Sequence, residues 1–488
     1  MGLNRRNFLQ VSGSGAALMI AGSGIAKKGV FAAVPPRWET SDVSFVGSSS
    51  TGTRKQVILD ALEPWRDMVA EQIEDKKILV KPNVVSYSNQ LIATHVDALR
   101  AVVEFLRSIT TQDIVIGESA ASRGVSTGFQ RLGYNNIANE YDDVAVVDLD
   151  DYSEITTVKR NVWKPDLTST NEIRIHSPFT DPEYYIISVT RPKTHAAAVI
   201  TGVCKNILMG SPAVDNKQLM HGKIGWWSGM NQGEAKCLNY NLFQLGNILF
   251  SNGVPALSVL DAWEGMEGNG PAGGTSIMQY CAIVGSDPLA VDRLMAKLMG
   301  LSDTPTEPMD KNHPSYTDAR ALYWLSNAGI GNYDLSKINF ILGSLEELED
   351  YVKTYDLPPL YTGSPSYATN WTGGPPDRVL DSEYVVAVED SRFLDPKPYL
   401  ATQMNSAISN RRVTIAFSLP TGFPINLAIY DLKGSEVRRL GYEYLPSGKY
   451  SVVWDCRDNH GTAVSSGRYI IRLTFDGKRS MSDQITIL

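Results

Sequence analysis

The stretch "YYIISVTRPKTHAAAVITGVCKNILMG", residues 184–210, decides the fold class of this chain. It opens with an uninterrupted apolar run at 184–189, which is typical of a strand buried on both faces of a sheet. Charged residues follow at once at 191–195, and the segment 196–210 has the length and composition of a helix. A buried strand followed by a helix is the unit from which parallel sheets are built.

The same unit recurs on both sides of this stretch. Helical patterns occupy 94–108, 288–300 and 317–329. Further apolar runs lie at 76–80, 113–119, 144–149, 256–260, 280–285 and 338–343. The alternation predicts an α/β domain over residues 34–354, with a mostly parallel, Rossmann-like sheet flanked by helices.

Two of these helices carry recognisable start signals. Asp287 precedes Pro288, so we expect Asp287 to cap the helix and the proline to occupy its first turn. In "THVD", Thr94 and Asp97 have the spacing of a capping box. That reading places His95 at the first helical position, beside the positive end of the helix dipole.

The composition changes after about residue 355. Residues 355–400 are rich in Pro, Gly, Ser and Tyr, and they predict a linker or an arm wrapped on the domain. Residues 401–488 contain short alternating strands separated by turn sequences such as "LPSGK" and "FDGKR". This pattern predicts a C-terminal all-β, Ig-like sandwich.

The first 33 residues read as a targeting segment. A charged start with adjacent Arg5 and Arg6, followed by Phe8 and Leu9, precedes a short, Gly/Ser-rich apolar stretch. This arrangement resembles a twin-arginine signal peptide, which implies the twin-arginine translocase as a partner. The expected location is periplasmic or extracellular, on a bacterial cell surface. An uncleaved anchor and a general secretory signal remain the alternatives.

Composition excludes two classes of function. The 488 residues carry a net charge of -8 and no strongly basic run, so we expect no binding of nucleic acid. The four cysteines (Cys204, Cys237, Cys281 and Cys456) lie far apart, and no C-x-x-C occurs. We therefore expect no iron–sulfur cluster and no cysteine-ligated zinc, and the sequence implies no disulfide pairing.

Ionisable side chains gather where the predicted strands end. Lys81, Glu118, Lys193 and Asp261 each stand at or just after such an end. In a parallel sheet these ends share one edge, and ligands bind there. Each residue read alone is as easily a solvated loop side chain or a helix cap, but together they predict a site.

The residue types in this region suit three kinds of chemistry. Candidates for acid–base catalysis and electrostatic anchoring are His195, His95, Lys193 and Lys205. An anionic small molecule, carboxylate or phosphate, would be held by Lys81, Asn83, Asn206 and a glycine-rich loop containing Gly268, Asn269 and Gly270. A divalent metal would draw its ligands from His95, His195, His221, Glu118, Asp261 and Glu264.

Motifs in both domains resemble known families. The segments "LVKPNVV", "RPKTHAAAVITGVCKNILMG" and "DAWEGMEGNGPAGGT", in this order, resemble the domain of unknown function DUF362 over about residues 43–344. The name of that family records no settled reaction. The segments "LAIYDLKGSEVRRL", "LPSGKYSVVWDCRDNHG" and "VSSGRYIIRLTF" resemble the Ig-like domain of FlgD flagellar hook-capping proteins. That resemblance implies a role in sorting or surface attachment.

Two functions fit these observations. The first is an exported enzyme that performs metal-assisted or acid–base chemistry on an anionic small molecule. The second is a non-catalytic ligand-binding protein of the periplasm or cell surface, attached through its Ig-like domain. We favour the enzyme, because a purely structural core has little reason to gather so many ionisable groups at one edge.

Overall fold

The computed structural model describes residues 40–48, 52–74, 76–120, 125–222, 232–304, 315–358, 374–376, 380, 399–404, 413–419, 423–445, 448–454, 456–459, 462–475 and 479–487. The predicted signal peptide, 1–33, lies outside these residues. Among the described helices, none combines the length and the apolar character needed to cross a bilayer.

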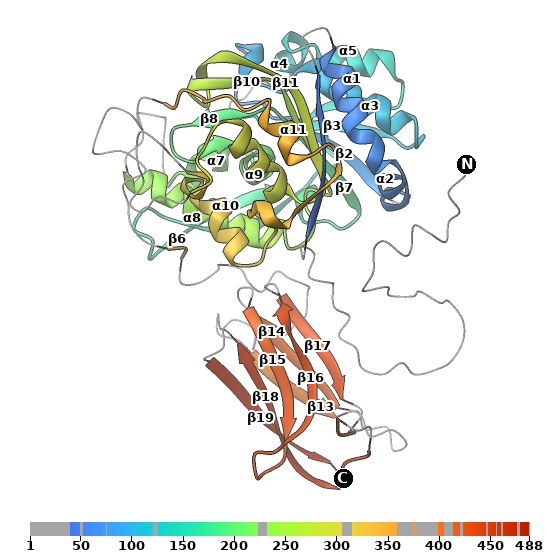
Figure 1. Ribbon diagram of the computed structural model, residues 1–488, viewed down its shortest axis with the longest axis vertical. Coiled ribbons are helices and arrows are strands. Elements are labelled where there is room, and N and C mark those ends of the chain that lie inside the picture. Colours follow the sequence, from blue (N-terminus) through green and yellow to red (C-terminus); the bar gives the residue numbers. More distant parts are fainter. Residues whose placement is uncertain are drawn as a thin grey trace.

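A ten-stranded sheet forms the centre of the N-terminal domain in the described residues (Figure 1). In pairing order, its main path is β12 (Ile338–Leu342), β1 (Ser41–Gly47), β11 (Gly273–Gly285), β10 (Leu257–Asn269), β7 (Tyr184–Thr190), β2 (Lys77–Lys81), β3 (Ile114–Glu118) and β4 (Val144–Asp148). The five strands from β10 to β4 are all parallel to their neighbours. β11 runs antiparallel to β10 and β1, so the mostly parallel sheet is confirmed.

Helices cover both faces of this sheet. One face carries α1 (Arg54–Leu62), α2 (Arg66–Gln72), α3 (Val96–Arg107), α4 (Val125–Arg131) and α5 (Tyr134–Glu140). The other carries α6 (Val203–Gly210), α7 (Lys217–Met220), α8 (Gln232–Leu249), α9 (Pro288–Leu298), α10 (Arg320–Asn327) and α11 (Leu345–Glu349). Short 3-10 turns are η2 (Glu63–Trp65), η3 (Gln90–Ile92), η4 (Ser177–Phe179), η5 (Val214–Asn216), η6 (Tyr316–Asp318) and η7 (Leu335–Lys337).

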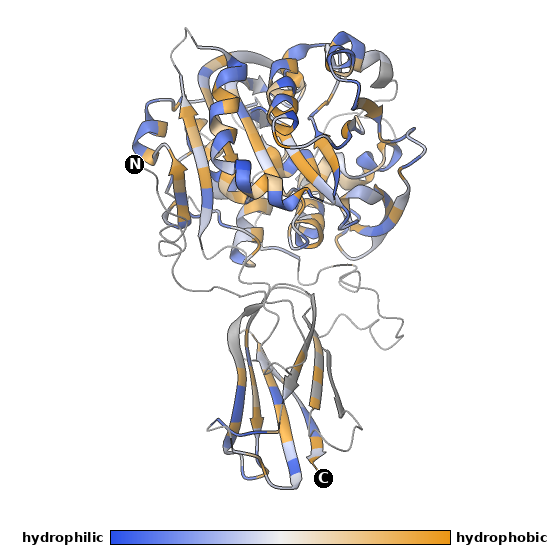
Figure 2. Ribbon diagram, turned by 90° about the vertical axis from the view of Figure 1, so that its right-hand side faces the viewer, coloured by the Kyte–Doolittle hydropathy of each residue, from blue (hydrophilic) through white to orange (hydrophobic). Residues whose placement is uncertain are grey.

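The strands are continuously apolar because both of their faces are covered. In β2, Ile78 and Val80 pack in the core beneath α1 and α3, whereas Leu79 packs in the core beneath α6 and α8. Side chains of a strand alternate between faces, so a strand buried on both sides needs an apolar residue at every position. Figure 2 shows hydrophobic residues concentrated in these strands, while the helices carry many hydrophilic residues.

The C-terminal domain is a sandwich of two antiparallel sheets. One contains β13 (Tyr399–Met404), β14 (Val413–Leu419) and β17 (Gly448–Trp454), and the other β16 (Glu436–Leu445), β15 (Phe423–Tyr430), β18 (Gly467–Phe475) and β19 (Arg479–Ile487). Both sheets contribute to one core, in which Trp454 is fully buried and meets the ring of Tyr469 edge-on. The predicted all-β sandwich is confirmed.

Described positions of the Pro/Gly-rich arm contact the N-terminal domain. The hydroxyl of Tyr240 donates to the carbonyl oxygen of Gly374 at 3.1 Å. The backbone N–H of Leu380 donates to Gln244 Oε1 at 2.7 Å, and the Leu380 side chain packs against Trp163. These contacts to α8 and β5 (Thr157–Trp163), which pairs with β6 (Thr170–His176), fit an arm that lies on the domain.

Two local predictions are wrong. Residues 196–210 are not one helix: β8 (Lys193–His195) pairs with β9 (Val199–Thr201), and α6 begins only at Val203. The predicted glycine-rich loop after Asp261 is instead a long hairpin, in which β10 and β11 stay paired from Ser258↔Gly285 to Asn269↔Gly273. The glycines are spread along paired strands, so they leave no open loop to surround an anion.

The cap of α3 also differs from the prediction, whereas that of α9 agrees with it. The hydroxyl of Thr94 accepts from the N–H of Asn83 and donates to the carbonyl of Val189, which ties the ends of β2 and β7 together. His95 is the N-cap in its place, because its Nδ1 accepts from the N–H of Asp97 at 3.1 Å. Asp287 caps α9 as expected, accepting from Leu289 N–H.

All four cysteines are buried free thiols. Burial raises the pKa of Cys281, whereas the pKa of Cys237 rises to about 12. Thiols in such surroundings stay protonated and behave as small apolar residues.

Candidate functional site

The carboxyl ends of β2, β3 and β7 meet at one edge of the sheet. Lys81 is the last residue of β2 and pairs in register with Ser188 of β7. Glu118 is the last residue of β3. Strand β7 ends at Thr190, and its continuation reaches Lys193 two residues after Arg191. The predicted convergence of Lys81, Glu118 and Lys193 is therefore what the topology produces.

Lys81 and Glu118 form a buried ion pair at this edge. Lys81 Nζ lies 2.5 Å from Glu118 Oε1, and both side chains are almost completely excluded from solvent. The second carboxylate oxygen of Glu118 accepts the N–H of Val84 at 2.8 Å. Burial lowers the pKa of Lys81, and the Glu118 carboxylate opposes that shift. Glu118 is thus engaged by protein groups on both oxygens.

Asn206 connects helix α6 to this ion pair. Its Oδ1 accepts from Lys81 Nζ at 3.2 Å and from Asn83 Nδ2 at 3.3 Å. Its Nδ2 donates to the carbonyl of Lys81 and to the hydroxyl of Ser188, each at 3.0 Å. The predicted binding residues Lys81, Asn83 and Asn206 therefore lie together, and they are already bonded to one another.

Gly210 allows α6 to approach this closely. A Cβ atom at Gly210 would lie 2.4 Å from Lys81 Cε and 2.6 Å from Lys81 Nζ. Carbon atoms that are not bonded do not approach within such distances, so a side chain here would displace the lysine. In the "KNILMG" motif, Asn206 thus forms hydrogen bonds to Lys81, and Gly210 leaves the room that the Lys81 side chain occupies.

Lys193 is buried without a carboxylate partner among the described residues. Its Nζ donates to Asn83 Oδ1 and, at 2.9 Å, to the carbonyl of Ile92. Burial lowers the pKa of Lys193 well below its usual value, and the charges of Arg191 and Lys205 lower it further. A lysine in such surroundings loses its proton readily, and two neutral acceptors satisfy both N–H groups of the uncharged amine.

His195 is held in one orientation by the backbone that follows it. Its Nδ1 accepts from the N–H groups of Ala197 at 3.0 Å and Ala198 at 3.2 Å. In the neutral ring the proton therefore resides on Nε2, which makes that atom a donor. Burial lowers the pKa of His195 well below its usual value, and the neighbouring Lys205 and His221 add to the shift.

The tip of the β10–β11 hairpin packs over the segment that carries Lys193 and His195. The Thr194 hydroxyl donates to the carbonyl of Gly268 at 2.9 Å, and Ala196 N–H donates to the carbonyl of Gly270 at 3.2 Å. A Cβ atom at Gly270 would lie 1.9 Å from the Thr194 carbonyl oxygen. Gly268 and Gly270 thus hold the segment that carries Lys193 and His195 against the tip of the hairpin.

A second group of charges lies beside β10. Arg54 Nε is 3.2 Å from Asp261 Oδ1, and Arg54 Nη2 is 3.0 Å from Glu264 Oε2. Arg191 Nη1 shares the same Glu264 oxygen at 3.2 Å. The positive charge of Arg54 and the burial of the ring together lower the pKa of His95, with burial the larger cause, and Asp261 opposes them. Asp261 and Glu264 therefore neutralise arginines.

The predicted metal ligands do not form one centre. No three His, Cys, Asp or Glu side chains in the described ranges come together in a way that could hold a metal ion. His95 belongs to the arginine group, whereas His195 lies near Lys205 and His221, and Glu118 is paired with Lys81. In the described residues, the carboxylates predicted as metal ligands pair with lysine and arginine side chains instead.

The sequence analysis missed Arg54 and Arg191 as members of the site. Arg191 stands in the conspicuous "RPKTH" segment, directly after a buried strand, so its position was a usable signal. Arg54 had none, because it opens a helix about 140 residues away, and only the packing of α1 against β10 and β11 brings it to Asp261.

Comparison with family models identifies both domains. Residues 78–297 match the domain of unknown function DUF362, and residues 403–478 match the FlgD Ig-like domain. The search of curated proteins found no match.

Several solved structures are similar to parts of this chain. A protein from Thermotoga maritima is 16% identical with a TM-score of 0.29, over 43% of this chain and 51% of its own. FlgD from P. aeruginosa is 20% identical with a TM-score of 0.15, over 19% of this chain and 73% of its own. PorZ, a surface component of the type-IX secretion system of Porphyromonas gingivalis, is 20% identical with a TM-score of 0.12, over 15% of this chain and 9% of its own. The chain thus spans about half of the Thermotoga protein and a small part of PorZ. In the order of its sequence, this chain carries a DUF362 domain followed by a FlgD Ig-like domain.

Proposed function

We propose that the strand edge binds a small anion with a carboxylate or phosphate group. The observation that supports this most directly is the unfilled edge of Arg191. Its side chain is 1% exposed, and within the described residues its Nε and Nη2 atoms have no hydrogen-bond partner. These two nitrogens form the fork that binds a carboxylate or phosphate through two parallel hydrogen bonds. Leaving them unpaired in the interior costs free energy that a bound anion would recover.

Lys193 provides the second half of the argument. Lys81 has Glu118 as its counter-ion, whereas Lys193 bonds to an amide oxygen and a backbone carbonyl. A buried ammonium without a counter-ion is unstable, so the lysine releases its proton when the site is empty. An anion bound between Arg191 and Lys193 would supply that counter-ion, so it would stabilise the lysine once the amine has accepted a proton.

The same geometry supports acid–base chemistry on the bound anion. The uncharged amine of Lys193 donates both of its hydrogens, and its lone pair is then available to accept a proton from the ligand. His195, two residues after Lys193, is neutral with its proton on Nε2, so it adds no positive charge that would oppose protonation of the lysine. We therefore propose an enzyme that moves a proton on an anionic small molecule, with Lys193 as the base.

The binding step is tested with a panel of inorganic phosphate, acetate, oxalate and lactate. We expect at least one of them to raise the melting temperature of the wild-type protein. The Arg191→Lys variant should lose most of that rise, because lysine cannot make the bidentate contact, while Arg174→Gln, which changes an exposed arginine on β6, should keep it. A rise retained in full by Arg191→Lys would refute the proposed fork.

Calorimetry tests the coupling to Lys193. Inorganic phosphate has no carbon-bound proton to give up, so if it stabilises the charged lysine, its binding takes up a proton from solvent, and the observed heat depends on the ionisation enthalpy of the buffer. Chemistry is then followed in D2O as loss of carbon-bound hydrogen from the anion that binds, with Lys193→Met as the comparison.

The alternative function, a non-catalytic binding protein, is favoured by the Ig-like domain. It predicts the same stabilisation with no exchange at carbon.

We also propose that the protein is exported by the twin-arginine translocase and acts at the bacterial cell surface or in the periplasm. Arg5 and Arg6 of the sequence and the FlgD Ig-like domain support this proposal. Cell fractionation of the wild type and of a variant with Arg5→Lys and Arg6→Lys tests it. The wild type should appear outside the cytoplasm and the variant should remain inside, and equal distribution of the two would contradict the proposed route.

A further inference from the structure

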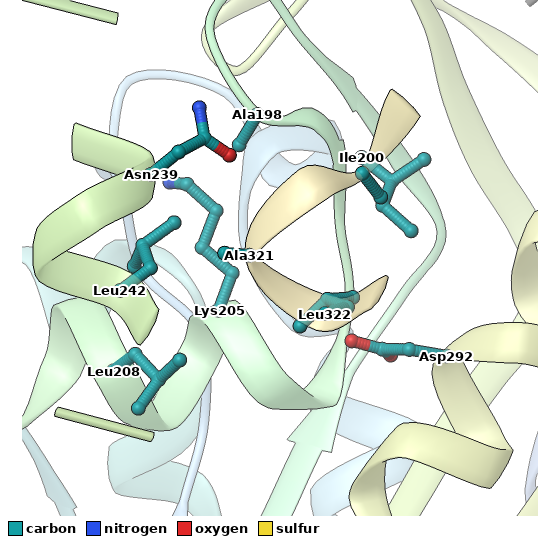
Figure 3. A pocket seen from close by; sticks show the side chains of 10 residues that line it. Ala198, Ile200, Lys205, Leu208, Asn239, Leu242, Asp292, Ala321 and Leu322 are labelled. Atoms are coloured by element: carbon teal, nitrogen blue, oxygen red, sulfur yellow. The ribbon is translucent and has the colours of Figure 1, made fainter. Parts of the chain in front are cut away.

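Lys205 lies in a pocket on the α6 side of the sheet. The pocket is open to solvent, and its enclosed part has room for about one water molecule. Apolar side chains form most of its lining, and Figure 3 shows Lys205 extending alongside Leu242 so that its amine lies next to Asn239. Asp292 lines the opposite side. The lysine residue is partly exposed, and its aliphatic chain lies among apolar neighbours.

The amine of Lys205 has no polar partner in the part of the chain that the structure describes. No hydrogen bond or ion pair joins it to any of those residues. This sets it apart from Lys217, whose Nζ donates to the carbonyl of Met209 at 2.7 Å. A lysine that merely bridged structural elements would be expected to make such contacts.

The charged groups around Lys205 oppose its protonation. Lys217 of α7 and Lys193 of β8 are lysines, and His195 of β8 is a further base. The carboxylate of Asp292 on α9 is occupied, because its oxygens accept the N–H groups of Val203 and Cys204 at 2.8 and 3.0 Å. Burial, with a contribution from Lys217, lowers the pKa of Lys205 to about 7. A substantial fraction of the amine is therefore uncharged, and hence nucleophilic, at neutral pH.

We propose that Lys205 forms an imine with a small aldehyde or ketone that reaches its amine through the open mouth of this pocket. The Nζ lone pair attacks the carbonyl carbon, and the new C–N bond gives a carbinolamine. The proton lost by nitrogen goes to the departing hydroxyl group, so one water leaves and a C=N bond remains. The apolar lining holds the carbon part of the ligand, and it disfavours competing hydration of the imine. This activity goes beyond the proposed anion site, and it does not require Arg191.

Reductive trapping of the wild-type protein tests the proposal. The full chain is incubated with acetaldehyde and sodium cyanoborohydride over a range of pH, and the ethylated lysines are located by peptide mass spectrometry. We expect Lys205 to be labelled early, with a rate that rises with pH and levels off above a midpoint near 7. The exposed Lys55, whose pKa is raised by Glu104, should still gain reactivity above pH 10 and provides the comparison within the same sample.

A matched variant completes the test. Lys205→Arg should remove the early label, whereas Lys217→Arg should retain it, because arginine preserves the positive charge next to Lys205. The wild-type measurement decides the question even if Lys205→Arg folds poorly. Labelling of Lys205 no faster than that of Lys55 at pH 7, or a midpoint near 10, would overturn the proposal. Loss of anion binding in Arg191→Lys with Lys205 still labelled would leave it intact, so the two proposals fail separately.

Discussion

Replacing Glu118 by glutamine tests whether the Lys81–Glu118 pair is the structural centre of the site. The two atoms of the pair lie 2.5 Å apart in an almost fully buried environment. Glutamine keeps the shape of the side chain but removes its charge, so Lys81 becomes a buried ammonium without a counter-ion. Breaking a buried pair on one side costs about 3–5 kcal/mol in the free energy of unfolding.

The free energy lost in the Glu118→Gln variant has an upper limit that depends on pH. Lys81 can give up its proton instead of staying charged, and the loss cannot exceed the free energy of that deprotonation. At about 1.36 kcal/mol per pKa unit, neutralising a lysine of unfolded pKa about 10.4 costs about 4.6 kcal/mol at pH 7 and about 1.9 kcal/mol at pH 9. Burial already lowers the pKa of Lys81, so the folded state binds fewer protons than the unfolded state below that unfolded value. The stability of the variant should therefore recover as the pH rises.

Urea denaturation of the full chain at pH 7 and pH 9 measures this effect. We expect Glu118→Gln to lose about 3–5 kcal/mol at pH 7 and less than about 2 kcal/mol at pH 9, in the transition of the α/β domain alone. The control is Glu104→Gln, which removes the carboxylate of an exposed pair with Lys55 at 2.9 Å and should cost less than about 1 kcal/mol at both pH values. A loss below 1 kcal/mol at pH 7, or an equal loss at both pH values, would refute the reasoning.

Three further variants probe the same framework. Gly210→Ala should destabilise the α/β domain by about 1–3 kcal/mol in urea denaturation, since its Cβ would lie 2.4 Å from Lys81 Cε; an unchanged midpoint would contradict that contact. Asp292→Asn should flatten the pH dependence of the melting temperature between about 4 and 7. Burial raises the pKa of Asp292 to about 7, so in the wild type the folded state retains a proton that the unfolded state releases, and stability falls as the pH rises through this window. A slope as steep as that of the wild type would count against this role. Trp454→Ala should cost about 3–5 kcal/mol in the Ig-like domain, where the indole is fully buried, and calorimetry should show the α/β transition unchanged.

The strands and helices of the sheet could be predicted because their signals are local. The apolar runs at 184–189 and 113–119 became β7 and β3 with few differences in their bounds. The prediction failed at 196–210 and in the Asp261–Thr275 segment, where pairing between strands joined by a short turn overrode local composition. Most of the glycines that look like a loop in the sequence lie on the paired strands β10 and β11. Gly270 lies in the turn between them, where the chain approaches Thr194 closely.

The candidate site, like the fold, has features that local sequence predicts and features that depend on tertiary contacts. The sequence by itself determined that Lys81, Glu118 and Lys193 share an edge, because parallel strands end on one side of their sheet. Only the tertiary structure decided which charges neutralise one another: Glu118 pairs with Lys81, and Asp261 and Glu264 pair with Arg54, leaving the fork of Arg191 unfilled. Ion pairing depends on distances of a few ångströms between segments far apart in the chain, and strand periodicity carries no information about those distances.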